Sequence, residues 1–387
     1  GFLRCPQTAC ACSLSLVSRE GLVHVFGGSG QKRVPVSYLA VLWYTSAAVA
    51  VTSSRGILRV THLPFCLSAC QFVISTGFTY TLLRWVLPWW TKGSFRVNLR
   101  DLPRESPERY IVHSIALTYT LGFLFTNVAL SLCNASFAET VKAAEPISSL
   151  ALAQLSRGED AVSRIEWLTT LPIVAGVGLS SYSETSFHVL GFLAAGTSNF
   201  MFSLRALHAK QLRRNHGSPV GLDDLHLFFR ISRFGSKLLV PIALLFEGRA
   251  LFRLLFSTPV AMATSPTVGG LLANSTEPVP GGLESPALEL GAAPTLSLSQ
   301  ILLLVLLNGI CYCTYNQTSF VVLGRVPFVT HATLNVMRRV FIIIVTSWYF
   351  QTAINGLNMF GIALAISGFS LFLYMKVYLS SLPTLPR

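Results

Sequence analysis

Apolar segments long enough to cross a lipid bilayer recur along most of this 387-residue chain. A membrane-spanning helix needs about 20 consecutive, mainly apolar residues. A composition of 52% hydrophobic and only 12% charged residues is far more apolar than that of a soluble domain. The sequence therefore predicts an all-helical (all-α) integral membrane protein with ten transmembrane helices. Their approximate spans are residues 37–54, 64–88, 110–132, 134–155, 165–182, 187–209, 224–246, 298–319, 328–350 and 355–378.

The positive charge of the chain is concentrated in alternate loops. The 29 Lys and Arg residues exceed the 16 Asp and Glu residues and give a net charge of +13. In a ten-span arrangement most of the basic residues beyond span ends share one side, and the other side has only Arg55, Arg59, Arg249 and Arg253. The positive-inside rule then places both termini in the compartment that holds the basic loops. The charge excess is mainly topological, so we expect no nucleic-acid partner.

A chain of ten spans divides into two sets of five, over residues 37–182 and 187–380. We expect these sets to be inverted repeats, as in transporters that bind substrate between two such halves. Residues 258–297, rich in Pro, Gly, Ser and Ala, are expected to form a disordered loop that interrupts the second set. The tail, residues 1–36, is equally compatible with the remnant of an organelle-targeting segment and with a plain disordered segment. Because it starts with Gly, we expect a fragment or a processed form.

Charged residues inside two of the spans indicate a function. The stretch SFAETVKAAEP in the fourth span contains Glu139, Lys142 and Glu145, and the ninth span contains Arg338 and Arg339. A charged side chain at mid-membrane costs about 2.5–3.5 kcal/mol, so such residues usually face a cavity on a substrate path. Steps of three residues let one side of a helix present all three charges of the fourth span. The Glu–Lys pairs could also neutralise each other as a purely structural feature.

The two adjacent arginines favour an anionic substrate. Arg338 and Arg339 point about 100° apart on a helix, and their span contains no acidic residue. Together with Lys142 they outnumber the nearby carboxylates. Guanidinium groups bind phosphate and carboxylate through paired hydrogen bonds. The sequence therefore predicts a phosphorylated or otherwise multiply anionic substrate.

The same segment carries a resemblance to a known family. SFAETVKAAEP resembles the SFTHTIKAxEP segment of the plastidic phosphate translocators, the triose-phosphate/phosphate translocator family of the drug/metabolite transporter superfamily. LGFLFTNVALS precedes it and TYNQTSFVVLGRVPFVTHATLNVMRRV follows in the order of that family, so the resemblance extends over about residues 38 to 380. It implies an antiporter that exchanges inorganic phosphate for phosphorylated C3 compounds (triose phosphate, 3-phosphoglycerate, phosphoenolpyruvate) by alternating access. It also implies a multi-pass protein of a plastid or plastid-derived membrane.

The resemblance also implies roles for particular residues. The phosphate-binding residues of the family fall on Lys142, Arg338, Arg339 and Thr126, and those that contact the rest of the substrate on Tyr315, Arg205, Phe123 and Glu139. Without the resemblance, Tyr315 could be ordinary core packing and the Thr126 hydroxyl could be satisfied by its own helix. Phe123 stands where triose-phosphate members have His, and Ala138-Glu139 replaces a Thr-His pair. The phosphate end is thus predicted to be retained and the selectivity end to be altered.

Phosphate exchange has three alternatives. A nucleotide-sugar transporter of the secretory pathway is the alternative within the same superfamily. A membrane enzyme would need carboxylate clusters for a metal, and a channel with so basic a site would trap anions. The cysteines, including the C-x-C pairs at 10–12 and 311–313, lack the flanking His or second pair of a metal site. We therefore expect a transporter and no enzyme, without metal or cofactor, whose partners are inorganic phosphate, small phosphorylated metabolites and membrane lipid; the sequence does not define an oligomeric state.

Overall fold

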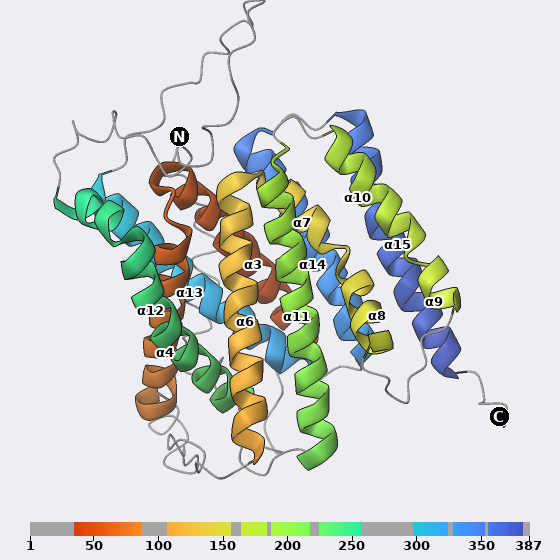
Figure 1. Ribbon diagram of the computed structural model, residues 1–387, viewed down its shortest axis with the longest axis horizontal. Helices are drawn as coiled ribbons and strands as arrows, with labels where there is room; N and C mark the ends of the chain where they lie inside the picture. Colours follow the sequence, from red (N-terminus) through yellow and green to blue (C-terminus); the bar gives the residue numbers. More distant parts are fainter. Residues whose placement is uncertain are drawn as a thin grey trace, which may run out of the picture.

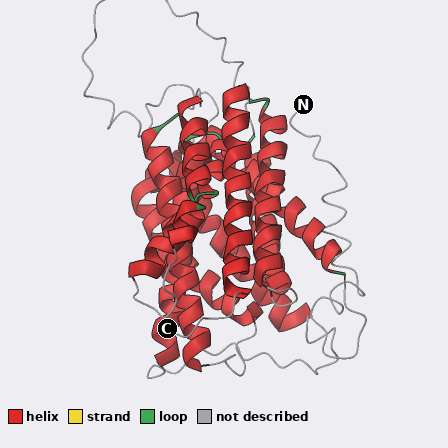
Figure 2. Cartoon of the chain, turned by 90° about the vertical axis from the view of Figure 1, so that its right-hand side faces the viewer, coloured by secondary structure: helices red, strands yellow, loops and turns green. Residues whose placement is uncertain are grey.

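The computed structural model describes residues 35–86, 107–155, 164–183, 187–216, 224–256, 297–323, 328–352 and 355–381. Within these ranges every regular element is a helix, and the helices form an elongated bundle (Figures 1 and 2). The predicted all-helical fold class is confirmed. The elements are α3 (Val36–Thr61), α4 (Pro64–Thr81) with its π-helical extension η1 (Leu82–Val86), α6 (Pro107–Leu132), α7 (Ala135–Lys142), α8 (Glu145–Leu155), α9 (Arg164–Leu168), α10 (Leu171–Ser183), α11 (Val189–His216), α12 (Asp224–Phe256), α13 (Leu298–Leu323), α14 (Phe328–Phe350) and α15 (Gly356–Ser381).

Among the described residues, five helical stretches are both long and apolar enough to cross a membrane. They are Val36–Thr61, Pro64–Val86, Arg109–Leu132, Leu298–Val322 and Gly356–Met375. They correspond to the first, second, third, eighth and tenth predicted spans. The other predicted spans fall on helices that contain charged residues or are broken.

Two predicted spans are not continuous helices. The span 134–155 divides into α7 and α8 just before Pro146, and the span 165–182 divides into α9 and α10 just before Pro172. A proline has no backbone N–H, and its ring clashes with the carbonyl group four residues earlier. Each of these two predicted spans therefore consists of two shorter helices. One consequence is that Lys142 lies at the end of α7, beside a helix break.

The helices pair in a pattern that relates the two halves of the chain. α3 packs on α13 and α6 packs on α11, while α4 packs on α12, α7 on α14 and α10 on α15. In chain order, α3, α4, α6, α7 and α10 of the first half correspond to α11, α12, α13, α14 and α15 of the second. Exchanging each helix with its counterpart turns the α3–α13 pair into the α11–α6 pair and leaves the other three pairs as they are. Such packing supports two related five-helix sets, although their boundaries, 37–182 and 187–380, stay predictions. The predicted tail 1–36 and disordered loop 258–297 lie almost entirely outside the described residues.

Glycines bring α10 and α15 into backbone contact. A Cβ atom on Gly176 would clash with the backbone nitrogen of Ala365, and one on Gly361 would lie 2.7 Å from the backbone nitrogen of Ser180. Small residues allow this approach between membrane helices. The Gly176→Ala variant should therefore lose about 1–3 kcal/mol of stability through overpacking. The measurement is thermal unfolding of purified protein in detergent.

Gly178 is the matched control on the same helix, because a Cβ atom there would meet nothing within 4 Å. Gly178→Ala should be neutral or slightly stabilising, since Ala favours a helix over Gly by about 1 kcal/mol. Equal effects of the two substitutions would contradict close packing at Gly176.

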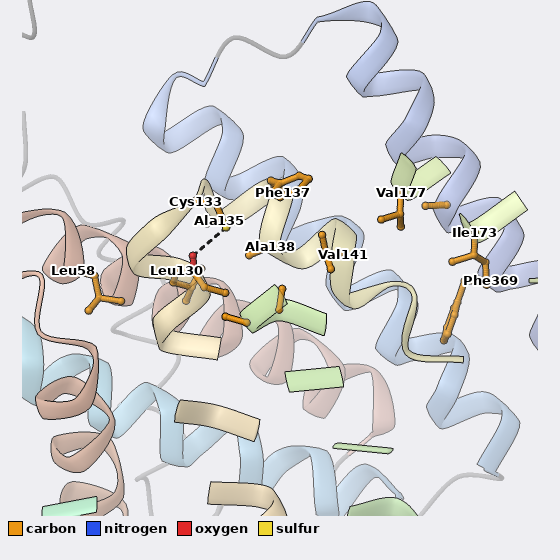
Figure 3. Close-up of a cluster of buried hydrophobic side chains, with 14 of the residues drawn as sticks. Leu58, Leu130, Cys133, Ala135, Phe137, Ala138, Val141, Ile173, Val177 and Phe369 are labelled. Atoms are coloured by element: carbon orange, nitrogen blue, oxygen red, sulfur yellow. Dashed lines mark hydrogen bonds between the residues drawn. The ribbon is translucent and has the colours of Figure 1, made fainter. Parts of the chain in front are cut away.

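One hydrophobic cluster surrounds α7. Figure 3 shows Phe137, Ala138 and Val141 of α7 near Ile173 of α10 and Phe369 of α15, and all five belong to a single buried cluster. These side chains anchor the helix that carries Glu139 and Lys142.

A second hydrophobic cluster lies among α4, α6, α12 and α13. It contains the buried aromatic residues Phe72, Tyr119, Phe228 and Tyr312. Partly buried aromatic side chains from α6, α11 and α13 pack against it, namely Phe123, Phe202 and Tyr315. The charged residues next to the first cluster and the aromatic residues on the second are brought together in the site described below.

Candidate functional site

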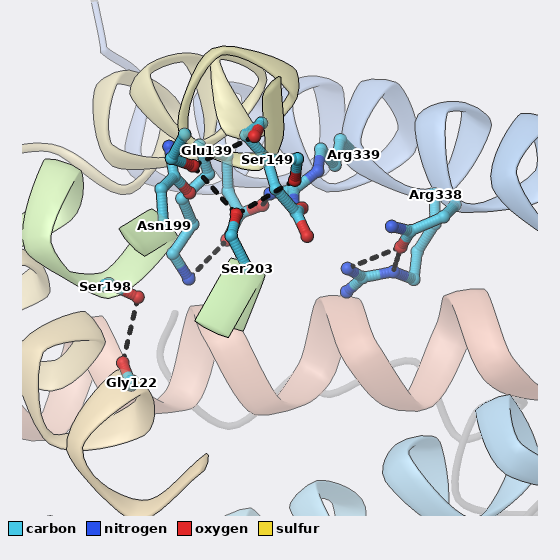
Figure 4. A network of polar contacts seen from close by, with 12 residues as sticks. Gly122, Glu139, Ser149, Ser198, Asn199, Ser203, Arg338 and Arg339 are labelled. Atoms are coloured by element: carbon cyan, nitrogen blue, oxygen red, sulfur yellow. Dashed lines mark hydrogen bonds and ion pairs between the residues drawn. The ribbon is translucent and has the colours of Figure 1, made fainter. Parts of the chain in front are cut away.

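A buried ion-pair network joins α7, α8 and α14. Nη2 of Arg339 lies 2.6 Å from Oε2 of Glu145, and its Nη1 lies 3.4 Å from Oε2 of Glu139. Nζ of Lys142 is 3.6 Å from the other carboxylate oxygen of Glu139. The side chains of Lys142, Glu139 and Arg339 are only 9%, 4% and 8% exposed. Two of the three predicted cations are therefore paired with carboxylates. Figure 4 shows Glu139 and Arg339 of this network.

Arg338 differs from its neighbour. Its Nε and Nη2 groups donate hydrogen bonds of 3.1 and 3.0 Å to the side-chain oxygen of Asn335, a neutral acceptor (Figure 4). Its guanidinium carbon lies 5.7 Å from the ring centre of Trp43 and 5.9 Å from that of Tyr315. Among the described residues no carboxylate pairs with it. The three cations thus exceed the two carboxylates, and the site keeps one positive charge.

Aromatic rings connect Arg338 to Lys142, so that the site residues form a closed chain of contacts. The ring centre of Tyr315 is 6.5 Å from that of Phe123, which is 5.0 Å from that of Phe202. Nζ of Lys142 is 6.0 Å from the centre of Phe202. Contacts therefore run from Arg338 through Tyr315, Phe123 and Phe202 to Lys142, and return through the ion pairs to Arg339. We call the charged residues of this chain of contacts the charged half of the site, and its aromatic residues the aromatic half.

Arg205 of α11 lies on the aromatic side. Its guanidinium carbon is 5.4 Å from the ring centre of Tyr119 and 5.8 Å from that of Phe202. A cation over an aromatic face is attracted by about 0.5–2 kcal/mol. Arg205 and Lys142 are thus linked through one phenylalanine, although they are on different helices.

Thr126 lies one helical turn from Phe123 but is already hydrogen-bonded. Its hydroxyl donates to the Gly122 carbonyl at 2.9 Å and lies 2.8 Å from the hydroxyl of Ser198. Ser198 also donates to the Gly122 carbonyl, at 2.9 Å (Figure 4). To reach a phosphate group, the Thr126 hydroxyl would have to leave these partners, and its phosphate-binding role stays a prediction.

Several residues of the site were not identified from the sequence. Phe202 is one of 26 phenylalanines in the chain, and no local pattern distinguishes it. Trp43 belongs to α3, far from Arg338 in sequence. The contact between Asn335 and Arg338 could have been predicted, because the two are three residues apart and such residues are neighbours on a helix. Serine hydroxyls also join α8 to α11, with Ser203 at 2.8 Å from Ser148 and 3.0 Å from Ser149.

Helices long and apolar enough to cross a membrane, with a broken helix beside buried charged residues that include more cations than carboxylates, are typical of a membrane transporter. The chain belongs to the Triose-phosphate Transporter family, whose model matches residues 34–375. The resemblance predicted from the sequence is therefore confirmed.

Proteins of known name are similar over nearly the whole chain. Phosphoenolpyruvate/phosphate translocator 2, chloroplastic, of Arabidopsis thaliana is 29% identical over 348 residues, which cover 89% of this chain and 78% of that protein. The triose phosphate/phosphate translocator, non-green plastid, chloroplastic, of Brassica oleracea var. botrytis is 28% identical, with 90% and 75% covered. The chloroplastic triose phosphate/phosphate translocator of Pisum sativum is 25% identical, with 96% and 79% covered.

Proposed function

We propose that this protein exchanges inorganic phosphate for phosphorylated three-carbon compounds across a plastid or plastid-derived membrane. The candidate substrates are triose phosphate, 3-phosphoglycerate and phosphoenolpyruvate. The observation that carries the proposal is the buried site with three cations and two carboxylates. The names of the similar proteins favour this function over nucleotide-sugar transport and over an enzymatic activity.

In this proposal the charged half of the site binds the phosphate group. Arg338 uses two N–H donors on Asn335, so three of the five donors of its guanidinium group are left for an anion. Lys142 and Arg339 supply the other two charges. The aromatic half, with Tyr315, Phe123 and Arg205, then contacts the carbon skeleton of the substrate.

Glu139 is better explained as an internal counter-ion than as a substrate contact. Its carboxylate lies between Lys142 and Arg339, and a negative carboxylate would repel phosphate. We propose that Glu139 and Glu145 hold the cations in place while the site is empty, and that an arriving phosphate shares or replaces these pairs. An empty site therefore has less unbalanced charge than three cations alone would give.

Obligatory exchange follows if the two helix sets close only around a neutralised site. Desolvation of a residual positive charge opposes closure, and a bound anion removes that charge. Rocking of the two halves around a midplane site then exposes the anion on the other side.

The test is counter-exchange in proteoliposomes loaded with inorganic phosphate. We expect uptake of labelled triose phosphate, 3-phosphoglycerate and phosphoenolpyruvate, and little uptake into liposomes that contain no counter-substrate. Equal uptake into empty liposomes would contradict exchange. Uptake of a nucleotide sugar in place of these compounds would support the alternative function.

Phe123 is predicted to weaken discrimination among the organic substrates. Its ring centre lies 4.7 Å from that of Tyr119 and 4.8 Å from that of Tyr312, so Phe123 itself adds bulk and no polar group to this end of the site. The wild type should accept both triose phosphate and phosphoenolpyruvate. Phe123→His adds a hydrogen-bond donor at the carbon end of the site. A substrate that leaves this donor without a partner loses about 1–3 kcal/mol, so the preference should shift towards triose phosphate several-fold.

The measurement is competition of each compound against labelled phosphate. Phe123→Leu is the control, because it changes shape without adding a polar group, and it should leave the preference between the two compounds nearly unchanged. The same ratio in the His variant and the wild type would show that Phe123 does not face the carbon end.

A further inference from the structure

A second group of basic side chains lies outside the central site, in a cleft between the early turns of α6 and α12. The cleft encloses a cavity of about 180 Å³. Five of the residues that line it are basic: Arg109, His113, Arg230, Arg233 and Lys237. α6 and α12 pack against each other, and these parts of both helices lie towards the lower end of the bundle in Figure 1.

The basic residues occupy one face of each helix. On α12, Arg230, Arg233 and Lys237 follow a spacing of three and four residues, and Arg109 and His113 are four residues apart on α6. Such spacings place side chains on a common face. The two faces therefore present their charges to a shared cleft, whereas basic residues that only set topology need no common direction.

The other residues that line the cleft are apolar. Val112, Ala116 and Phe234 also line it. The His113 ring meets the Phe234 ring edge-on, with centres 5.5 Å apart. A cleft lined by both basic and apolar residues suits an anionic group that carries some apolar surface.

The charges in the cleft favour an anion. Four of the side chains that line it are those of Arg and Lys, and no acidic residue is among the described residues that line it. Arg230 and Arg233 also have other interactions within the protein, so the inference rests on the combined charge of the group. A bound phosphate would offset repulsion among these side chains and accept several charge-assisted hydrogen bonds.

This cleft is distinct from the central site. Ala116 in the cleft and Phe123 of the central site are seven residues apart on α6, which corresponds to about 11 Å along a helix. Tyr119 lies between them and is fully buried, with its ring centre 6.3 Å from that of Phe202 and 6.4 Å from that of Phe228. A single small phosphate ester is too short to contact both places.

We propose that the cleft between α6 and α12 is a second binding site for a phosphate-bearing anion. The phosphate could belong to the headgroup of an anionic lipid or to a free anion in solution. Both sources use the same chemistry, and the cleft lies at the ends of α6 and α12 that the positive-inside rule assigns to the side with the basic loops. Basic pockets between membrane helices on such a side bind anionic headgroups.

The test compares two pairs of substitutions on α12. Arg233→Gln with Lys237→Gln removes two charges from the cleft. Arg249→Gln with Arg253→Gln removes two exposed charges at the other end of the same helix and is the matched control. In the first arm, retention of phosphatidylglycerol from mixed phosphatidylcholine nanodiscs is counted by native mass spectrometry. In the second arm, binding of labelled inorganic phosphate is measured in pure phosphatidylcholine nanodiscs.

The second arm is carried out on an Arg338→Gln background, so that the central site does not contribute. We expect the cleft variant to bind at least about tenfold less phosphatidylglycerol, inorganic phosphate or both, because each basic side chain near a lipid surface contributes about 1 kcal/mol. The control variant should bind as much as its parent. A loss in the first arm identifies a lipid headgroup and a loss in the second a soluble anion. No loss in either arm, or an equal loss in the control, would overturn the proposal.

Both arms measure binding, so failure of the proposed exchange activity would not affect them. If the double variant does not fold, Lys237→Gln alone is measured against Arg253→Gln, since both side chains are exposed. The same two outcomes then decide the proposal, with a smaller expected loss of about fivefold.

Discussion

Replacement of Arg338 with Gln should reduce phosphate homo-exchange at least about 100-fold, while the protein still inserts and can be purified. A 100-fold loss corresponds to about 2.8 kcal/mol, which lies within the range of about 1.5–3 kcal/mol for a hydrogen bond to a charged group. Among the described residues Arg338 has no carboxylate partner, so its removal leaves no acid unpaired. The remaining Lys142, Arg339, Glu139 and Glu145 balance in charge. Activity should therefore fall without a matching loss of stability.

Arg59→Gln is a matched control for this experiment. Arg59 is also an arginine over an aromatic ring, with its guanidinium carbon 4.4 Å from the centre of Phe350, but it is exposed near the end of α3. Exchange in proteoliposomes should stay close to that of the wild type in this variant. If Arg338→Gln retained near-normal exchange, the charged half of the site would not be the phosphate site.

The sequence was most informative where the physical cause is local. Apolar length predicted α14 at 328–350, the bounds that the structure gives it. It was less informative for α12, which continues to Phe256 rather than ending at 246, because Arg249 and Arg253 interrupt the apolar run but not the helix. Hydropathy alone also missed the breaks before Pro146 and Pro172, which depend on backbone hydrogen bonding and not on polarity.

The same difference applies to the site: some of its residues could be predicted from the sequence and others could not. Lys142, Arg338 and Arg339 could be selected because a charge inside an apolar span is conspicuous. Which carboxylate pairs with which cation could not be predicted, since Arg339 and Glu139 are separated by 200 residues in the chain. The aromatic half was also hidden, because Phe202 and Tyr119 resemble the many other aromatic residues of the bundle until the helices are packed together.

Glu139→Gln should give the largest change in stability, and that change should depend on phosphate. The Glu139 carboxylate is 4% exposed and pairs with both Lys142 and Arg339. Removing one partner of a buried ion pair destabilises a protein by about 3–5 kcal/mol, because charge is left uncompensated. In this variant the empty site would hold three cations and only the carboxylate of Glu145. Without phosphate, the Tm of purified protein in detergent should fall by several degrees.

Phosphate should then raise the Tm of the Glu139→Gln variant more than that of the wild type, because the bound anion supplies the missing negative charge. Glu247→Gln is the control. Glu247 is also buried, but it accepts backbone N–H groups of Phe65 and Cys66, at 3.1 and 2.7 Å, at the start of α4. Its loss should lower the Tm without changing the gain from phosphate. If phosphate stabilised both variants and the wild type equally, Glu139 would not be a counter-ion that an incoming phosphate replaces, and the ion pairs of α7 and α14 would be structural only.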